Sequence, residues 1–186
     1  MLLLTRFAPL VAAVLALAGC GSSGSSKSTS SATTASQPPG QSAANTGGSL
    51  APRVDAIPCT AEALQVHYHA HIWLLRDGRP VTVPAGIGIN PEAGCLYYLH
   101  THTPDGVIHI ESPAQRPFSL GEFFDVWHQP LSNTQAATLS GPLRFFVGRR
   151  RITGDPRKLV LQPHMRIAIE QGRAVPPPAF TFPQGE

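Results

Sequence analysis

Histidine occupies every second position of segment 67–71, where the sequence reads His-Tyr-His-Ala-His. Successive side chains of a β-strand point to opposite faces of the sheet. As a strand, this segment therefore places His67, His69 and His71 in a row on one face. The intervening positions, together with Ile72, form the other face. The alternation from Val66 onwards predicts a strand that is half buried.

Further histidines follow in segment 100–109, so that six of the eight histidines of the chain lie within these two segments. Residues 96–102 predict a second strand. Residues 103–106, Thr-Pro-Asp-Gly, have a type I turn signature. Residues 107–111 predict the strand that returns from this turn.

The length of this turn decides where His109 points. A four-residue loop at 103–106 sets His100 opposite His109, whereas a three-residue loop with a glycine bulge turns His109 away. Both loops are compatible with the turn residues. The apolar alternation favours the first, because a slip of one residue would place Ile108 and Ile110 among the histidines.

Many short strand-like segments separated by Gly and Pro, with one short helix, predict an all-β fold. We expect an antiparallel β-sandwich or barrel. A capping box at Ser119 and Glu122 predicts the helix, near residues 119–128. The strand-like segments are 64–75, 81–83, 96–102, 107–111, 143–147, 151–152, 159–161 and 166–170.

Neutral imidazole is the commonest protein ligand for zinc and copper, so the histidine pattern predicts a metal site. The candidate ligands are His67, His69, His71, His100, His102 and His109. His67 and His71 would lie roughly 13 Å apart along a strand, so one ion cannot take the whole row. Either one flanking histidine is not a ligand, or two ions bind. Glu111 and Asp125 are candidates to orient an imidazole.

Three functions are compatible with these histidines. The first is metal binding, with Zn(II) or Cu(II) favoured over Cu(I) because Met165 is the only methionine beyond the leader. The second is a metal-dependent enzyme, in which three histidines leave a position open for water or for oxygen chemistry. The third is a metal-free module of the cell envelope whose histidines sense acidity. His128 and His164 are weaker candidates as ligands.

Two cysteines of the folded part, Cys59 and Cys95, precede the two histidine segments. Outside the cytoplasm such a pair is expected to form a disulfide, which would stabilise the fold by roughly 3–4 kcal/mol. The alternatives are thiolate ligands for a soft metal such as Cu(I), or free thiols.

The N-terminal segment 1–19 combines a basic start with a short apolar run, which predicts a signal peptide. Its end, Leu-Ala-Gly followed by Cys20, resembles the lipobox of bacterial lipoproteins. That resemblance implies cleavage before Cys20, lipid modification of this cysteine, and anchoring to the membrane on the extracytoplasmic side of the cell envelope. Residues 20–51 are rich in Ser, Gly and Thr and predict a flexible linker. Residues 52–186 predict a single domain. The net charge of the whole chain, +3, is too small to indicate nucleic-acid binding.

Overall fold

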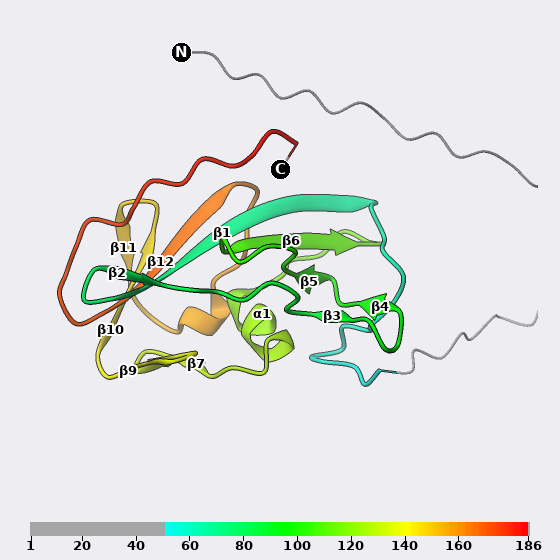
Figure 1. The fold of residues 1–186 in the computed structure, drawn as a ribbon, viewed down its shortest axis with the longest axis horizontal. Coiled ribbons are helices and arrows are strands. Elements are labelled where there is room, and N and C mark those ends of the chain that lie inside the picture. The colour runs from blue at the N-terminus through cyan, green and yellow to red at the C-terminus, as the bar shows by residue number, and fades with distance from the viewer. Residues whose placement is uncertain (1–50, 186) are drawn as a thin grey trace, which may run out of the picture. The chain divides into compact units, whose positions relative to one another are not determined.

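The computed structural model describes residues 51–185 (Figure 1). The expected signal peptide, the lipid-modified Cys20 and all but the last residue of the linker lie outside the described residues. The strands are β1 Val66–Arg76, β2 Arg79–Val81, β3 Ile89–Asn90, β4 Cys95–Leu96, β5 Leu99–His100, β6 Val107–Ser112, β7 Leu131–Ser132, β8 Gln135–Ala136, β9 Leu139–Ser140, β10 Leu143–Val147, β11 Arg150–Ile152 and β12 Met165–Gln171. The helices are α1 Leu120–Val126 and the 3-10 helix η1 Pro156–Lys158.

The main sheet has seven strands, in the order β11-β10-β12-β1-β6-β5, with β2 also paired to β1. The β-rich fold with one short α-helix is therefore confirmed. Two details differ from the expectation. Among the described residues the sheet does not close into a barrel, and β12 pairs with β1 in parallel. Parallel neighbours need a long crossover, which the chain makes through α1 and the strands after β6.

The two faces of β1 have different roles. Ala70, Ile72 and Leu74 are buried in the hydrophobic core, which also contains Phe123 and Phe124 of α1. The alternate residues of β1, among them the histidines, lie on the opposite face. Figure 1 shows the long β1 with β6 running beside it, so this second face extends across both strands.

The strand register brings histidines of three strands into one row. His69 of β1 lies opposite His109 of β6, and His109 lies opposite His100 of β5. The pairing of His100 with His109 is the one expected for the four-residue loop, and it is confirmed. Gly106 in this turn has a φ of +86°, and a Cβ there would lie 2.4 Å from the carbonyl oxygen of Ile72. Glycine thus lets the turn approach β1 closely.

Two expected strands take another form. The segment 96–102 is divided into β4, which pairs with β3, and β5, which pairs with β6. The partner changes between Tyr97 and Tyr98. The N–H of Tyr97 still donates to the carbonyl of Gly88, next to β3, whereas the carbonyl of Tyr98 accepts from the N–H of Glu111 in β6. The segment 159–161 forms only a single bridge, between Val160 and Ser119, after η1.

Local features at the two ends of the histidine region agree with the sequence. The disulfide between Cys59 and Cys95 is confirmed, with 5.4 Å between the two Cα atoms. The capping box of Ser119 and Glu122 at the start of α1 is confirmed as well. Among the described residues, no helix is both long enough and apolar enough to span a membrane.

Candidate metal centre

The candidate site is built on the polar face of three neighbouring strands, β1, β6 and β5. The row of His69, His109 and His100 runs across these strands. One step along the same face, Glu111 of β6 lies opposite His67 of β1. Because β-strands place alternate residues on one face, the side chains of Glu111 and His67 point to the same side of the sheet as those of the histidine row.

A first group of donors consists of His67, His69, His109 and Glu111. Nε2 of His69 lies 3.1 Å from Nε2 of His67 and 3.0 Å from Nδ1 of His109. Oε1 of Glu111 lies 3.4 Å from Nε2 of His67 and 3.5 Å from Nδ1 of His109. Four ligands arranged tetrahedrally at 2.0–2.1 Å from a zinc ion lie about 3.4 Å from one another. These four separations are therefore close to those between the ligands of a zinc ion, and all the donor atoms of the group lie within 4.8 Å of one another.

Hydrogen bonding among imidazoles accounts for these contacts only in part. A ring nitrogen carries either one proton or one lone pair, so it makes one full hydrogen bond. Nε2 of His69 nevertheless has two nitrogen neighbours, on His67 and His109, at 3.1 and 3.0 Å. Three ring nitrogens converging in this way are suited to a shared cation, which accepts a lone pair from each.

A second group consists of His100, His102, His109 and Glu111. Nε2 of His100 lies 3.1 Å from Nε2 of His102 and 3.7 Å from Oε2 of Glu111. Nδ1 of His100 donates a hydrogen bond to the carbonyl of Tyr97 at 2.9 Å. This bond holds the proton on Nδ1, so the lone pair of Nε2 points towards the other donors. In metal sites, the second ring nitrogen of a ligating histidine commonly donates such a hydrogen bond, which orients the ring.

Burial sets the protonation of these groups. It lowers the pKa of His69 and His100 to about 4 and that of His109 to about 3, and the charges of neighbouring histidines act in the same direction. Burial also raises the pKa of Glu111 to about 7, and the carboxylate of Glu62 adds to this effect. The three imidazoles are therefore neutral at pH 7, which is the form that binds a metal.

The structure places His71 outside both groups of donors. Its ring stacks on Phe180 of the C-terminal segment, with 3.6 Å between the ring centroids, and its edge meets Trp73. Nε2 of His71 donates to the carbonyl of Asp105 at 2.9 Å. The side chain is fully buried by these contacts. Five of the six expected ligands are thus brought together, and the sixth packs next to them.

The remaining candidates have other partners. Asp125 pairs with Arg157, and not with an imidazole of either group. His128 is an exposed residue just after α1. His164 is closer to the site, because its backbone N–H donates to the carbonyl of His69 at 2.7 Å, while its ring lies against Phe182. The disulfide removes Cys59 and Cys95 as thiolate ligands.

One residue near the site was missed by the sequence reasoning. The exposed Glu62 lies close enough to Glu111 and His100 to shift the pKa of both. It precedes β1 in a segment without strand periodicity, so the alternation that identified the histidines could not identify it. Glu111 was expected only to orient an imidazole, whereas the structure places it within reach of a shared ion.

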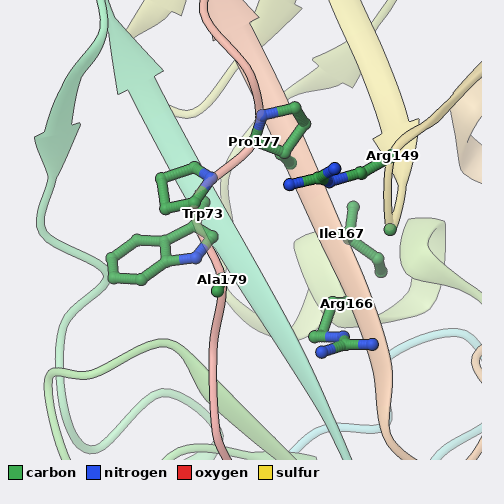
Figure 2. Close-up of a pocket in the computed structure, with 9 residues that line it drawn as sticks. Trp73, Arg149, Arg166, Ile167, Pro177 and Ala179 are labelled. Carbon is green, nitrogen blue, oxygen red and sulfur yellow. The ribbon is translucent and has the colours of Figure 1, made fainter.

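A cavity of about 200 Å³ lies at another part of the sheet (Figure 2). It is lined by Trp73, the guanidinium groups of Arg149 and Arg166, and prolines of the C-terminal segment. None of the histidines contributes to its lining. The candidate metal centre is therefore a group of converging side chains on the sheet, separate from this cavity.

No protein-family model, no curated protein and no solved structure matches the chain. The functional interpretation therefore depends on the geometry of the described residues.

Proposed function

We propose that this protein is a metal-binding protein of the cell envelope, which binds zinc or copper through the histidines of β1, β5 and β6. The observation that carries the proposal is the convergence of the ring nitrogens of His67, His69 and His109 with a carboxylate oxygen of Glu111. Neighbouring donor atoms are 3.0–3.5 Å apart, and all four lie within 4.8 Å of one another. Buried neutral imidazoles would otherwise need several acceptors, which the short contacts between nitrogens do not supply.

The chemistry of the donors supports Zn(II) or Cu(II) over Cu(I). All the donor atoms of the two groups are imidazole nitrogens or carboxylate oxygens. Soft sulfur ligands, which favour Cu(I), are missing from both groups, and the two cysteines are joined to each other.

The arrangement of the first group supports binding over catalysis. A catalytic zinc site keeps three protein ligands and an open position, whereas a closed site has four. With Glu111 beside His67, His69 and His109, the first group offers four donors. A metal-dependent enzyme is the second hypothesis from the sequence, and at an ion held by all four donors of the first group it would need a ligand that leaves.

Export and lipid anchoring are part of the proposal. The leader supports them through its apolar run and its lipobox-like end at Cys20. The disulfide between Cys59 and Cys95 supports an oxidising compartment, because such bonds are rare in the cytoplasm. Replacement of Cys20 with Ala should release the chain from the detergent-soluble membrane fraction. Unchanged partitioning would contradict the anchor and leave the metal site untouched.

Metal analysis of the full chain, purified without a His-affinity step, tests the central claim. We expect at least about one equivalent of zinc or copper per chain. Replacement of His69 with Ala should lower metal affinity by at least about 100-fold, because this ring contacts two other donors. The matched control is His128→Asn, since asparagine tolerates the positive φ of this position and the ring is in neither group. Metal-free wild-type protein, or equal affinity in both variants, would refute the proposal.

A further inference from the structure

Glu111 lies between the two groups of donors and belongs to both. Its two carboxylate oxygens face different histidines. Oε1 is 3.4 Å from Nε2 of His67 and 3.5 Å from Nδ1 of His109, whereas Oε2 is 3.7 Å from Nε2 of His100. The backbone of Glu111 is held on both sides, opposite His67 on β1 and through a hydrogen bond to the carbonyl of Tyr98. The carboxylate is therefore fixed across the gap between the groups.

One oxygen of this carboxylate lacks the partner that a buried charge requires. Glu111 is 2 % exposed, and its Oε2 has no hydrogen-bond partner among the described residues. The neighbouring Glu62 brings a charge of the same sign and shares a side-chain hydrogen bond with Glu111, and both interactions favour the protonated form of Glu111 when no cation is bound. A buried carboxylate without compensation is expensive, whereas coordination of a cation at each oxygen would offset that cost.

One ion cannot use all the donors. Two ligand atoms of one ion lie at most about 4.2 Å apart, which is twice a zinc–nitrogen bond. Among the described residues, no set of donor atoms within 4.8 Å of one another contains His67 and His69 together with His100 and His102. The two pairs of histidines therefore cannot bind the same ion.

We infer that the site binds two divalent ions, bridged by the carboxylate of Glu111. This inference rests on the proposed metal-binding function. Oε1 binds the first ion together with His67, His69 and Nδ1 of His109. Oε2 binds the second ion together with His100 and His102.

The two ions have different environments. The first has four protein ligands, which complete a tetrahedral shell. The second has three, because His109, which belongs to both groups, is assigned to the first ion through Nδ1, which lies 3.0 Å from Nε2 of His69. One of these three ligands, His102, is an exposed residue. The second ion therefore keeps a position for water or for an incoming ligand, and it is the ion that exchanges first.

Titration of the full metal-free chain with Cu(II), followed by electron paramagnetic resonance, tests the bridge. We expect two equivalents to bind, the second about tenfold or more weakly because it has one protein ligand fewer. The first should give the signal of an isolated ion. The second should diminish that signal and add the half-field transition of a coupled pair, because a shared carboxylate holds the ions close together.

Two double variants assign the ions to their ligands. His100→Gln with His102→Gln should leave one equivalent with an uncoupled signal and first-ion affinity. His67→Gln with His69→Gln should leave one weakly bound equivalent. Thermal unfolding shows whether each double variant is folded, because His69 and His100 are buried.

Replacement of Glu111 with Gln removes the negative charge and the bridging carboxylate, and it changes the size of the side chain little. We expect loss of the coupled signal and a decrease of at least about tenfold in the affinity for the second ion. The control is Glu92→Gln, because Glu92 is exposed and belongs to neither group. Binding of a single equivalent by the wild type, or of two equivalents without coupling, would overturn the bridge and leave the proposed function intact. Binding of none would overturn both.

Discussion

At the scale of single residues, identical side chains in one row take different roles because of what covers them. His69 and His71 are both fully or nearly fully buried on the same face of β1. His69 meets two other imidazoles, whereas His71 meets the ring of Phe180 and the carbonyl of Asp105. The first contacts suit a metal, and the second suit a core histidine whose ring is stacked and hydrogen-bonded.

Replacement of His71 with Ala should therefore affect stability and not metal content. We expect the free energy of unfolding of the metal-free protein to fall by about 2–4 kcal/mol, because the stack on Phe180 and the bond to Asp105 are lost. Urea unfolding measures this loss, and metal analysis should show the wild-type stoichiometry. If His71→Ala removes an equivalent of metal as His69→Ala does, the separation of these two residues is wrong.

The alternation of the sequence identified which histidines share a face, and the structure brings five of the six together. It could not separate His71 from the others, because the residue that covers it, Phe180, lies more than a hundred positions further along the chain. Glu62 was not predicted for a similar reason, because its approach to Glu111 depends on tertiary packing and not on local periodicity.

At the scale of elements, the turn between β5 and β6 sets the register on which the proposed metal centre depends. We expect Gly106→Ala to destabilise the protein by about 1–3 kcal/mol, because it combines a positive φ with a clash against the carbonyl of Ile72. It should also weaken metal binding by moving β6 away from β1. Gly86→Ala is the matched control, because Gly86 has a φ of +76° but open space around it. Equal effects of the two variants in urea unfolding would contradict a role for the close approach.

The disulfide between Cys59 and Cys95 joins the segments that lead into two of the histidine strands, β1 and β5. Cys59 lies just before β1, and Cys95 opens β4, which leads into β5. The double variant Cys59→Ser with Cys95→Ser should lose about 3–4 kcal/mol of stability in urea unfolding, through the greater entropy of the unfolded chain. It should bind metal at the wild-type stoichiometry under conditions in which it is folded. Loss of metal from the folded variant would show that the bond also positions the ligands.

Strands and turns with strong local signals were predictable, among them the alternating β1, the Thr-Pro-Asp-Gly turn and the capping box of α1. The parallel pairing of β1 with β12 was not, because it joins segments separated by the whole crossover. The break between β4 and β5 also escaped prediction. It is a change of partner, from the side of β3 at Tyr97 to β6 at Tyr98, which leaves no trace in the apolar pattern.

At the scale of the whole molecule, the site links folding to pH. Burial lowers the pKa of His69, His71 and His100 to about 4 and that of His109 to about 3, against 6.5 for an exposed histidine. Below pH 6.5 the unfolded chain therefore binds protons that the folded chain excludes, and stability falls as the pH falls towards 4. Glu111 acts in the opposite direction, because its pKa of about 7 lets the folded state bind a proton first.

The four histidines outweigh the single glutamate, so the metal-free protein should lose on the order of 5 kcal/mol of stability between pH 7 and pH 5. Urea unfolding in the presence of a chelator, at several pH values across this range, measures the slope. His71→Leu should make the slope shallower by about one proton, because it removes one excluded charge and leaves all the donor groups in place. Stability that is constant or increases on acidification would show that these imidazoles are protonated in the folded protein. The folded protein would then lack the neutral ring nitrogens that the proposed metal centre needs.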